Sequence, residues 1–510
     1  MNLIKKIGFA LLGGVLCAFL TAPVSARAES PSATEIIKEM KIGWNLGNSL
    51  ESFGDWTSGL DLETAWGNPR TTKEMIDRIA ELGFSTVRIP VSWGKHTSGP
   101  DYRIDAEWMA RVKTVVDYCR ENDLYVILNI HHDDQTGYFC PTSDRFEETN
   151  KFVTCVWEQV AAEFADYDYH LVFEVFNEPR IVGSTYEWWF DINNPPAEIL
   201  DAVECINKIN RNGLDTIRAA GGNNATRLVM CPGYDASIDG ARISGYQLPE
   251  DKANMVGVAI HAYTPYNFAM NVNTSEGAGT QFTASFKGEL DWFFNEVNNN
   301  FVSKNIPVYI GEFGATDKAN TEERVKWAEY YTKKCADMGI ACMVWDNNVP
   351  EKGADKGERF GVLNRSTLEV YDTAYVNALL KYLGTKGEYF KADDGLEDKD
   401  KDSQGEDSRD VSGKDKDSED KDTEDKDSKD KDTEDKDSKD KDAEDKDSKD
   451  KDAEDKDSED KDSEDKDSGS PTSILSIAVW LIAGTVLCVL GIVLFVVVLV
   501  KGKKKKETSD

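Results

Sequence analysis

The middle of the chain alternates short apolar runs with helical segments, and this alternation constrains the fold more than any other feature. Eight runs rich in β-branched and aromatic residues predict strands at 41–46, 84–91, 125–131, 171–176, 227–231, 255–262, 307–312 and 341–345. Helical periodicity predicts helices at 72–82, 106–121, 148–165, 197–220, 286–301, 322–338 and 373–383. Only the connection at 234–254 has a weak helical pattern.

Eight strands that alternate with helices over ~350 residues predict one α/β domain, a (β/α)8 TIM barrel, rather than an open doubly wound sheet. The chain also lacks the glycine-rich phosphate loop that an open nucleotide-binding sheet requires. In such a barrel, the side chains at the C-terminal ends of the strands converge on one face, where active sites are built.

Polar and aromatic residues stand at the C-terminal end of every predicted strand except the fifth. The fourth strand is the clearest case, because the apolar run of LVFEVFNEP (171–179) breaks at an Asn-Glu pair and ends at a proline, which cannot donate to a sheet. The residues at these ends are Asn45, Arg88, His131, His132, Asn177, Glu178, His261, Tyr263, Glu312 and Trp345.

Two of these ends carry glutamates, Glu178 after the fourth strand and Glu312 after the seventh. Two carboxyl groups that face each other across a groove are the minimum equipment for glycoside hydrolysis, one protonated and the other ionised. Arg88 and the hydroxyl of Tyr263 are candidates to hold Glu312 ionised, so we expect Glu178 to stay protonated. Asn177 is suited to a sugar 2-hydroxyl.

The strings GWNLGNSLE, WGNP, TVRIPVSW, ILNIHHD, FEVFNEP, HAY, IGEFG and VWDNN occur in this order along the chain. In these motifs the chain resembles glycoside hydrolase family 5, the clan A barrel family of endo-β-1,4-glucanases. The wording is closest to its subfamily four, which includes cellulases, lichenases and xyloglucanases. The resemblance extends over residues 35–383.

The resemblance implies that Glu178 is the acid/base, that Glu312 is the nucleophile, and that the anomeric configuration is retained. It implies that the sugar under attack is lined by Arg88, His131, Asn177, His261, Tyr263 and Trp345. Asn45 and His132 are further candidates for substrate contacts. So are the tryptophans Trp44, Trp66 and Trp93, whose flat rings suit the apolar face of a β-linked glucose but are equally expected to pack in the core.

Several of these residues have a second interpretation. His131 and His132 are a possible metal pair, but neighbours on a strand point to opposite faces, so we predict no metal site. Arg88 is a candidate to neutralise Glu174, whose even spacing from Glu178 directs it inward as well. The chemistry requires only two carboxyl groups and water, so no cofactor is expected. Three loop tryptophans are candidates to extend the groove: Trp56, Trp188 and Trp189.

The two ends of the chain predict export and retention at a membrane. Residues 1–28 combine two lysines, a short apolar run and small residues, as a secretory signal peptide does. Residues 29–390 form the predicted catalytic domain. Residues 473–500 are expected to span a membrane, and the basic tail at 501–510 places that end in the cytoplasm. The protein is therefore expected at the cell surface, with its catalytic domain outside.

Residues 391–472, between the domain and the predicted span, are charged and of low complexity. Ten pentads of the form Asp-Lys-Asp-(Ser/Thr/Ala)-(Glu/Lys) run from 415 to 464; seven carry −2 each, so they supply −14 of the net charge of −34. Such a segment cannot bury enough apolar surface to fold, and we predict a disordered stalk. The acidic balance argues against nucleic-acid binding.

The sequence therefore predicts a retaining endo-glycosidase that cleaves internal β-1,4 bonds of cellulose or related β-glucans, with a monomeric catalytic domain. The alternatives are the same fold acting mainly on xyloglucan, mixed-linkage glucan, xylan or mannan, or a non-catalytic surface protein that binds carbohydrate. The seven cysteines between the signal and the span are odd in number and scattered over a large domain, so they do not form a disulfide framework. We expect mostly buried free thiols, with one or two bridges as the alternative.

Overall fold

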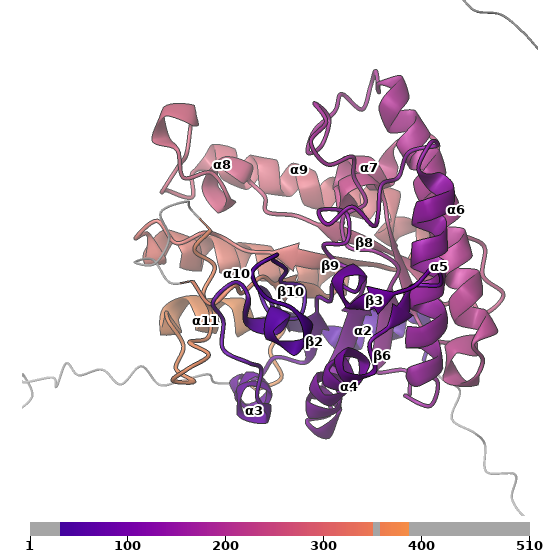
Figure 1. Cartoon of the computed structure of the whole chain (residues 1–510). Coiled ribbons are helices and arrows are strands. Elements are labelled where there is room, and N and C mark those ends of the chain that lie inside the picture. The colour runs from indigo at the N-terminus through magenta and orange to yellow at the C-terminus, as the bar shows by residue number, and fades with distance from the viewer. Residues whose placement is uncertain (1–30, 350–357, 387–510) are drawn as a thin grey trace, which may run out of the picture. The chain divides into compact units, whose positions relative to one another are not determined.

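The computed structural model describes residues 31–349 and 358–386. In these residues eight parallel strands close into a barrel that is surrounded by helices, which confirms the predicted fold (Figure 1). Around the barrel the strands are β1 (Ile42–Asn45), β2 (Thr86–Ile89), β5 (Tyr125–Asn129), β6 (Leu171–Glu174), β7 (Val229–Pro232), β8 (Val256–His261), β9 (Val308–Phe313) and β10 (Cys342–Val344).

All seven predicted helices form, as α3 (Lys73–Leu82), α4 (Ala106–Glu121), α5 (Phe146–Glu163), α6 (Ala197–Ala219), α9 (Ala284–Asn300), α10 (Thr321–Met338) and α11 (Thr373–Leu380). The connection between β7 and β8, where the helical pattern of the sequence is weak, contains the short elements η4 (Tyr234–Ala236) and α7 (Ile238–Arg242). Elements that were not predicted are α2 (Ala33–Met40), α8 (Tyr266–Ala269), η1 (Gly59–Thr64), η2 (Gly94–His96), η3 (Gly222–Ala225), η5 (Thr274–Glu276), η6 (Val302–Lys304) and the antiparallel pair β3 (Thr97–Ser98) and β4 (Arg103–Ile104).

Helix α2 packs against the barrel core. Ser32 and Glu35 form a capping box, in which the Ser32 amide donates to the Glu35 carboxylate at 2.8 Å. The buried face of the helix, which includes Ile36 and Met40, joins one hydrophobic cluster with strand residues such as Tyr309. The apolar filling of the barrel is thus shared between the strands and this helix.

Every residue of the eight barrel strands is buried, and the period of two divides them into an inner and an outer set. On β5, Tyr125 and Ile127 belong to the cluster inside the barrel, whereas Val126 and Leu128 pack in the larger core that includes the helices. Asn129 continues the inner set and is buried and polar. The inner face therefore changes from apolar to polar toward the C-terminal ends of the strands.

Some predictions concern residues outside those described. They are the signal peptide at 1–28, the acidic tract at 391–472, the membrane span at 473–500 and the basic tail at 501–510. Among residues 31–349 and 358–386, no helix is both long and apolar enough to cross a bilayer. The seven cysteines in this part of the chain are free thiols.

Arg227 generates a prediction about stability. Its side chain is 1% exposed and donates to the Asn224 side chain and to the carbonyl oxygens of Phe164, Tyr167, Asp168 and Leu171. Arg227→Gln leaves several buried acceptors unpaired, so we expect a loss of about 3 kcal/mol or more in the free energy of unfolding. Denaturant midpoints measure this loss.

The matched control is Arg211→Gln, because Arg211 is a half-exposed residue of α6 that, within the described part of the chain, pairs with Asp215 and a carbonyl oxygen. Its expected cost is below about 0.5 kcal/mol. Equal midpoints for the two variants would contradict the assigned role of Arg227.

Candidate active site

Two glutamates meet at the C-terminal end of the barrel. Glu178 follows β6, and Glu312 lies within β9. One carboxylate oxygen of each, together with Nδ1 of His261, lie within 4.8 Å of one another. The side chains are 14% and 7% exposed, so both carboxyl groups are largely shielded from water. The barrel thus brings together the two glutamates that the sequence singled out.

Arg88 links the glutamates of the barrel interior. Its fully buried guanidinium donates through Nη1 to Glu312 Oε1 at 2.8 Å. It also donates through Nη2 and Nε to the two oxygens of Glu174, at 2.6 and 3.2 Å. Arg88 therefore contacts both carboxylates to which the sequence linked it, because one planar guanidinium can serve several acceptors at once.

Asn45 and Asn177 complete the acceptors around this guanidinium. The side-chain oxygen of Asn45 accepts from Arg88 Nη1 at 2.9 Å, and that of Asn177 accepts from Nη2 at 2.6 Å. Asn45 is fully buried and its amide donates to the carbonyl oxygen of Gly311 at 3.0 Å. The prediction that Asn45 contacts substrate is therefore wrong, since its side chain is enclosed by the barrel and fixes Arg88.

Glu174 also accepts from the Arg88 guanidinium and is held ionised by several donors. Asn129 donates to its Oε1 at 3.0 Å, and the hydroxyl of Tyr309 donates to its Oε2. Burial raises the pKa of Glu174, but Arg88, His261 and Tyr309 together outweigh burial and the net pKa is lowered. Asn129 and Tyr309 had not been predicted as site residues. Their inward register on β5 and β9 was the available signal.

Both oxygens of Glu312 accept hydrogen bonds. Oε1 accepts from Arg88, and Oε2 accepts from the hydroxyl of Tyr263 at 2.8 Å, as predicted. Burial raises the pKa of Glu312 above its ordinary value, although the charges of His261 and Arg88 act in the opposite direction. The prediction that these two donors hold Glu312 ionised is therefore wrong in the direction of the pKa, because burial outweighs them. They orient the carboxylate and offset part of the cost of burying it.

The pKa of Glu178 corrects a prediction. We expected this carboxyl to stay protonated, but His261 Nδ1 lies 2.7 Å from its Oε1. Burial raises the pKa of Glu178, yet the hydrogen bond and charge of His261 and the charge of Arg180 outweigh burial and lower the pKa to about 2. Burial lowers the pKa of His261, but Glu312 and Glu178 outweigh it and raise the pKa. The proton of the pair therefore resides on the imidazole.

The tryptophans divide into buried and rim residues. Trp44 and Trp93 are fully buried, and their indole nitrogens donate to Asp346 at 2.7 Å and to the carbonyl oxygen of Asn129 at 2.9 Å. The predicted sugar contacts of Trp44 and Trp93 are therefore wrong, since both rings face the core and have no surface to offer. The three loop tryptophans are exposed: Trp56 (72%), Trp188 (60%) and Trp189 (71%).

An aromatic wall stands beside the glutamates, in which His131 is buried and Trp66, His132 and Trp345 are partly exposed. His131 lies parallel to Trp345, with ring centroids 6.1 Å apart. His132 contacts Trp66 at 5.6 Å and lies edge-on to His131 at 4.3 Å. The two histidines do not point to opposite faces, because β5 ends at Asn129 and the strand geometry no longer applies to them.

A cation-binding arrangement is present in geometry, because Glu178, His261 and Glu312 offer donor atoms within 4.8 Å. Each of these atoms already has a protein partner: Glu178 pairs with His261, and both oxygens of Glu312 accept from Arg88 and Tyr263. A guanidinium in this position competes with a metal ion for the same carboxylate. We assign the three side chains to proton transfer and nucleophilic chemistry.

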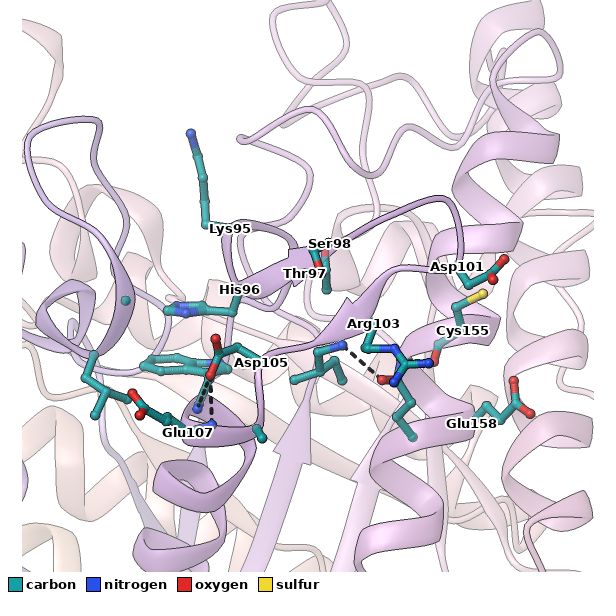
Figure 2. Close-up of a pocket in the computed structure, with 16 residues that line it drawn as sticks. Lys95, His96, Thr97, Ser98, Asp101, Arg103, Asp105, Glu107, Cys155 and Glu158 are labelled. Carbon is teal, nitrogen blue, oxygen red and sulfur yellow. Dashed lines mark hydrogen bonds between the residues drawn. The ribbon is translucent and has the colours of Figure 1, made fainter.

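A separate cavity of about 1030 Å³ lies between the β3–β4 hairpin, α4 and α5 (Figure 2). His96 stacks on Trp108 at its edge, with ring centroids 3.5 Å apart, and burial lowers the pKa of His96 to about 4. Neither glutamate of the rim lines this cavity. The chemistry is therefore assigned to the end of the barrel and not to this hollow.

Comparison with known proteins assigns the family. Residues 50–351 match the family model described as cellulase, glycosyl hydrolase family 5. The chain belongs to this family. The prediction that it is an endo-β-1,4-glucanase of family 5 is thereby confirmed.

Relatives and solved structures agree with this assignment. The chain is 42% identical to endoglucanase B of Neocallimastix patriciarum, over 69% of its own length and 72% of that protein. A family 5 lichenase from Caldicellulosiruptor sp. F32 is 42% identical, with a TM-score of 0.66 over 69% of this chain and 96% of that one. A GH5-4 broad specificity endoglucanase from Ruminococcus champanellensis, solved with bound cellotriose, is 42% identical, with a TM-score of 0.64 over 69% and 99%.

The pairing of His261 with Glu178 generates a prediction about pH dependence. The raised pKa of His261 means that the pair loses its last proton only at a pH above the ordinary range of histidine. In His261→Gln, which keeps a donor but cannot carry this proton, only the carboxyl of Glu178 remains to hold it. The basic limb of the pH dependence of kcat/KM should therefore move to lower pH.

His96→Gln is the matched control, because His96 is buried beside Trp108 and outside the rim. Its basic limb should stay at the wild-type position. A basic limb that is unchanged or moves upward in His261→Gln would show that the proton is not shared with this imidazole.

Proposed function

We propose that the domain is a retaining endo-β-1,4-glucanase that cleaves internal bonds of cellulose or related β-glucans, with Glu312 as nucleophile and Glu178 as acid/base. The observation that carries this proposal is the spacing of the two carboxyl groups, because one oxygen of each lies within 4.8 Å of the other. Retaining glycosidases separate the two groups by about 5–5.5 Å, whereas inverting enzymes need about 6.5–9.5 Å to admit a water.

In the first step Glu312 attacks the anomeric carbon, and the bond to the leaving sugar breaks. Arg88 and Tyr263 hold the carboxylate in a fixed orientation, so little reorganisation is needed for attack. The departing oxygen receives a proton from Glu178, which draws it from His261 through their 2.7 Å contact. A covalent glycosyl-enzyme and a shortened chain are the products of this step.

In the second step a water replaces the leaving sugar beside Glu178. The carboxylate of Glu178 accepts a proton from this water, which attacks the anomeric carbon and releases Glu312. The proton returns to the pair that Glu178 forms with His261, and the site is restored. The charges balance without any other group, because one carboxylate is regenerated and one proton is recovered.

The groups around the glutamates favour a β-linked glucan as substrate. Asn177 is adjacent to Glu178 and suited to a 2-hydroxyl, and Trp345 offers a partly exposed ring beside His131. Related structures contain cellotetraose or cellotriose, which supports this class. Xyloglucan, mixed-linkage glucan, xylan and mannan are the alternatives, since loop residues read the differences between them.

A non-catalytic carbohydrate-binding protein is the second candidate. Such a protein has no need to keep two carboxyl groups oriented, yet here both are retained with separate donors at each. This arrangement favours the enzyme.

The two glutamates generate a prediction about activity. On carboxymethyl cellulose, Glu178→Gln should lower reducing-end release by about 10²–10⁴-fold, because a general acid/base is lost. Glu312→Gln should abolish release, because no nucleophile remains. A surface control, Glu204→Gln on α6, should retain full activity.

The stereochemistry tests the retaining mechanism in the same experiment. Proton NMR of the first products should detect the β-anomer before mutarotation. Release of the α-anomer would contradict the role of Glu312 as nucleophile, and equal activity in the wild type and both glutamine variants would contradict the enzyme itself.

We also propose that the enzyme is tethered at the cell surface. The support is the uncharged stretch 474–500, whose 27 residues span ~40 Å as a helix and exceed a hydrocarbon core of ~30 Å, and the lysines that follow it. The full chain should fractionate with membranes and require detergent for release, whereas a chain ending at residue 472 should appear in the medium. Release of both forms without detergent would contradict tethering.

A further inference from the structure

The cavity between the β3–β4 hairpin, α4 and α5 has the size of a ligand site (Figure 2). Its volume of about 1030 Å³ is at the upper end of the ~300–1,000 Å³ that small-molecule sites occupy, which is enough for a ligand of several rings. Ser98 lines it from the hairpin, Ala106 from the start of α4 and Cys155 from the middle of α5. Three separate elements therefore enclose one cavity, apart from the catalytic glutamates.

His96 contributes a buried polar ring to this cavity. Its side chain is 6% exposed, and its ring stacks on Trp108 with an angle of 5° between the planes. Within residues 31–349 and 358–386 the imidazole makes no hydrogen bond or ion pair. Its nitrogens are not enclosed in the core, so they open into the cavity that His96 lines. Burial lowers the pKa of His96 to about 4, so the ring is uncharged at neutral pH and offers one donor and one acceptor. A buried ring with unused nitrogens indicates a site that lacks its partner.

Three exposed charged side chains extend this set of unused groups. They are Arg103 on the hairpin, Glu107 on α4 and Glu158 on α5. In the part of the chain that the structure describes, none of the three side chains makes an ion pair or a hydrogen bond. Figure 2 shows them around the same cavity as His96, and Ile104 adds apolar surface between them. Donors and acceptors thus come from all three walls.

The charge of the lining decides which class of ligand fits. Two charged side chains are positive and four are negative, which gives a net charge of −2: Lys95, Arg103, Asp101, Asp105, Glu107 and Glu158. This balance disfavours an anion. The helix end offers no alternative, because Asp105 already accepts from the amides of Glu107 and Trp108 at 2.7 and 3.3 Å.

A metal ion is disfavoured as well. Among the described residues, no group of three candidate metal ligands gathers in this cavity. A neutral ligand rich in hydroxyl groups remains, because a hydroxyl can donate to a carboxylate and accept from a guanidinium or an imidazole. A polysaccharide chain is such a ligand.

One loop connects the cavity to the substrate groove. At the rim, Phe53 packs edge-on against Trp66, with ring centroids 5.2 Å apart. Further along the same loop, Leu60 lines the cavity. Lys95 of the cavity wall pairs with Asp55 of this loop at 2.9 Å. The cavity therefore borders the loop that also forms the rim of the groove, so one polymer can contact both.

We propose that this cavity is a second, non-catalytic binding site for a β-glucan chain, in which Arg103, Glu107 and Glu158 hydrogen-bond sugar hydroxyls beside the imidazole of His96. The inference rests on the proposed function for the identity of the sugar, and it adds a site that holds polymer without cleaving it. A chain held there raises the effective concentration of substrate at the catalytic groove.

Two ligands of different length separate the two sites. Cellopentaose is short enough for the catalytic groove alone to cleave it, whereas phosphoric-acid-swollen cellulose can also occupy the cavity. The test compares the full chain, in detergent, with the triple variant Arg103→Ala, Glu107→Ala, Glu158→Ala. The Kd for swollen cellulose, measured by depletion in the Glu312→Gln background, should rise about tenfold. In the active chain, kcat/KM on cellopentaose should stay at the wild-type value.

Calorimetry with cellohexaose counts the sites directly. Glu312→Gln should bind two molecules per chain, and addition of the three alanine substitutions should leave one. One molecule per chain before and after these substitutions would overturn the second site.

The matched control is the double variant Glu204→Gln, Arg211→Gln, which removes surface charges of both signs from α6, outside the cavity. It should keep the wild-type Kd and kcat/KM. An unchanged Kd for swollen cellulose in the triple variant would overturn the proposal. So would an equal loss with both ligands in the triple variant and in Arg103→Ala alone. A wild type that binds swollen cellulose but cleaves neither ligand would instead refute the proposed function, so the two failures are distinguishable.

Discussion

The buried guanidinium of Arg88 is the interaction on which the rest of the site depends. A cation with no exposure is costly unless every donor is used, and here it serves Glu174, Glu312, Asn45 and Asn177 at once. The carboxylates of Glu174 and Glu312 can both be buried because this one charge pairs with each of them. The site is therefore a charge-balanced part of the core as well as a reactive surface.

The second constraint is the sharing of one proton between Glu178 and His261. A buried carboxyl would ordinarily have a raised pKa, but a hydrogen-bonded imidazole at 2.7 Å reverses the direction. The acid/base function then belongs to the pair. Arg180 contacts both Glu178 and Trp188, so it links the loop after β6 to the reacting carboxyl group.

Sequence patterns predicted the elements well because the period of apolar residues and the position of strand-ending prolines are local properties. They also predicted Arg88, Tyr263 and both glutamates as members of one site, since parallel strands must end at the same face. They were wrong for Trp44, Trp93 and Asn45, because whether a residue near a strand end faces the core or the groove depends on the covering loops. They missed Tyr309 and Asn129, although the inward register of both residues on β9 and β5 was an available signal.

The sequence by itself determined the eight-strand barrel, the two glutamates at its rim and the family. The alternation of strands and helices and the short motifs can be read from the sequence without three-dimensional information. Only the tertiary structure decided that the proton resides on His261 and not on Glu178. That outcome depends on a 2.7 Å contact between residues that are 83 positions apart and on the charge of Arg180 beside them. The pKa of Glu178, in LVFEVFNEP, is set by its surroundings. Those surroundings are assembled from β6, β8 and the loops that follow them.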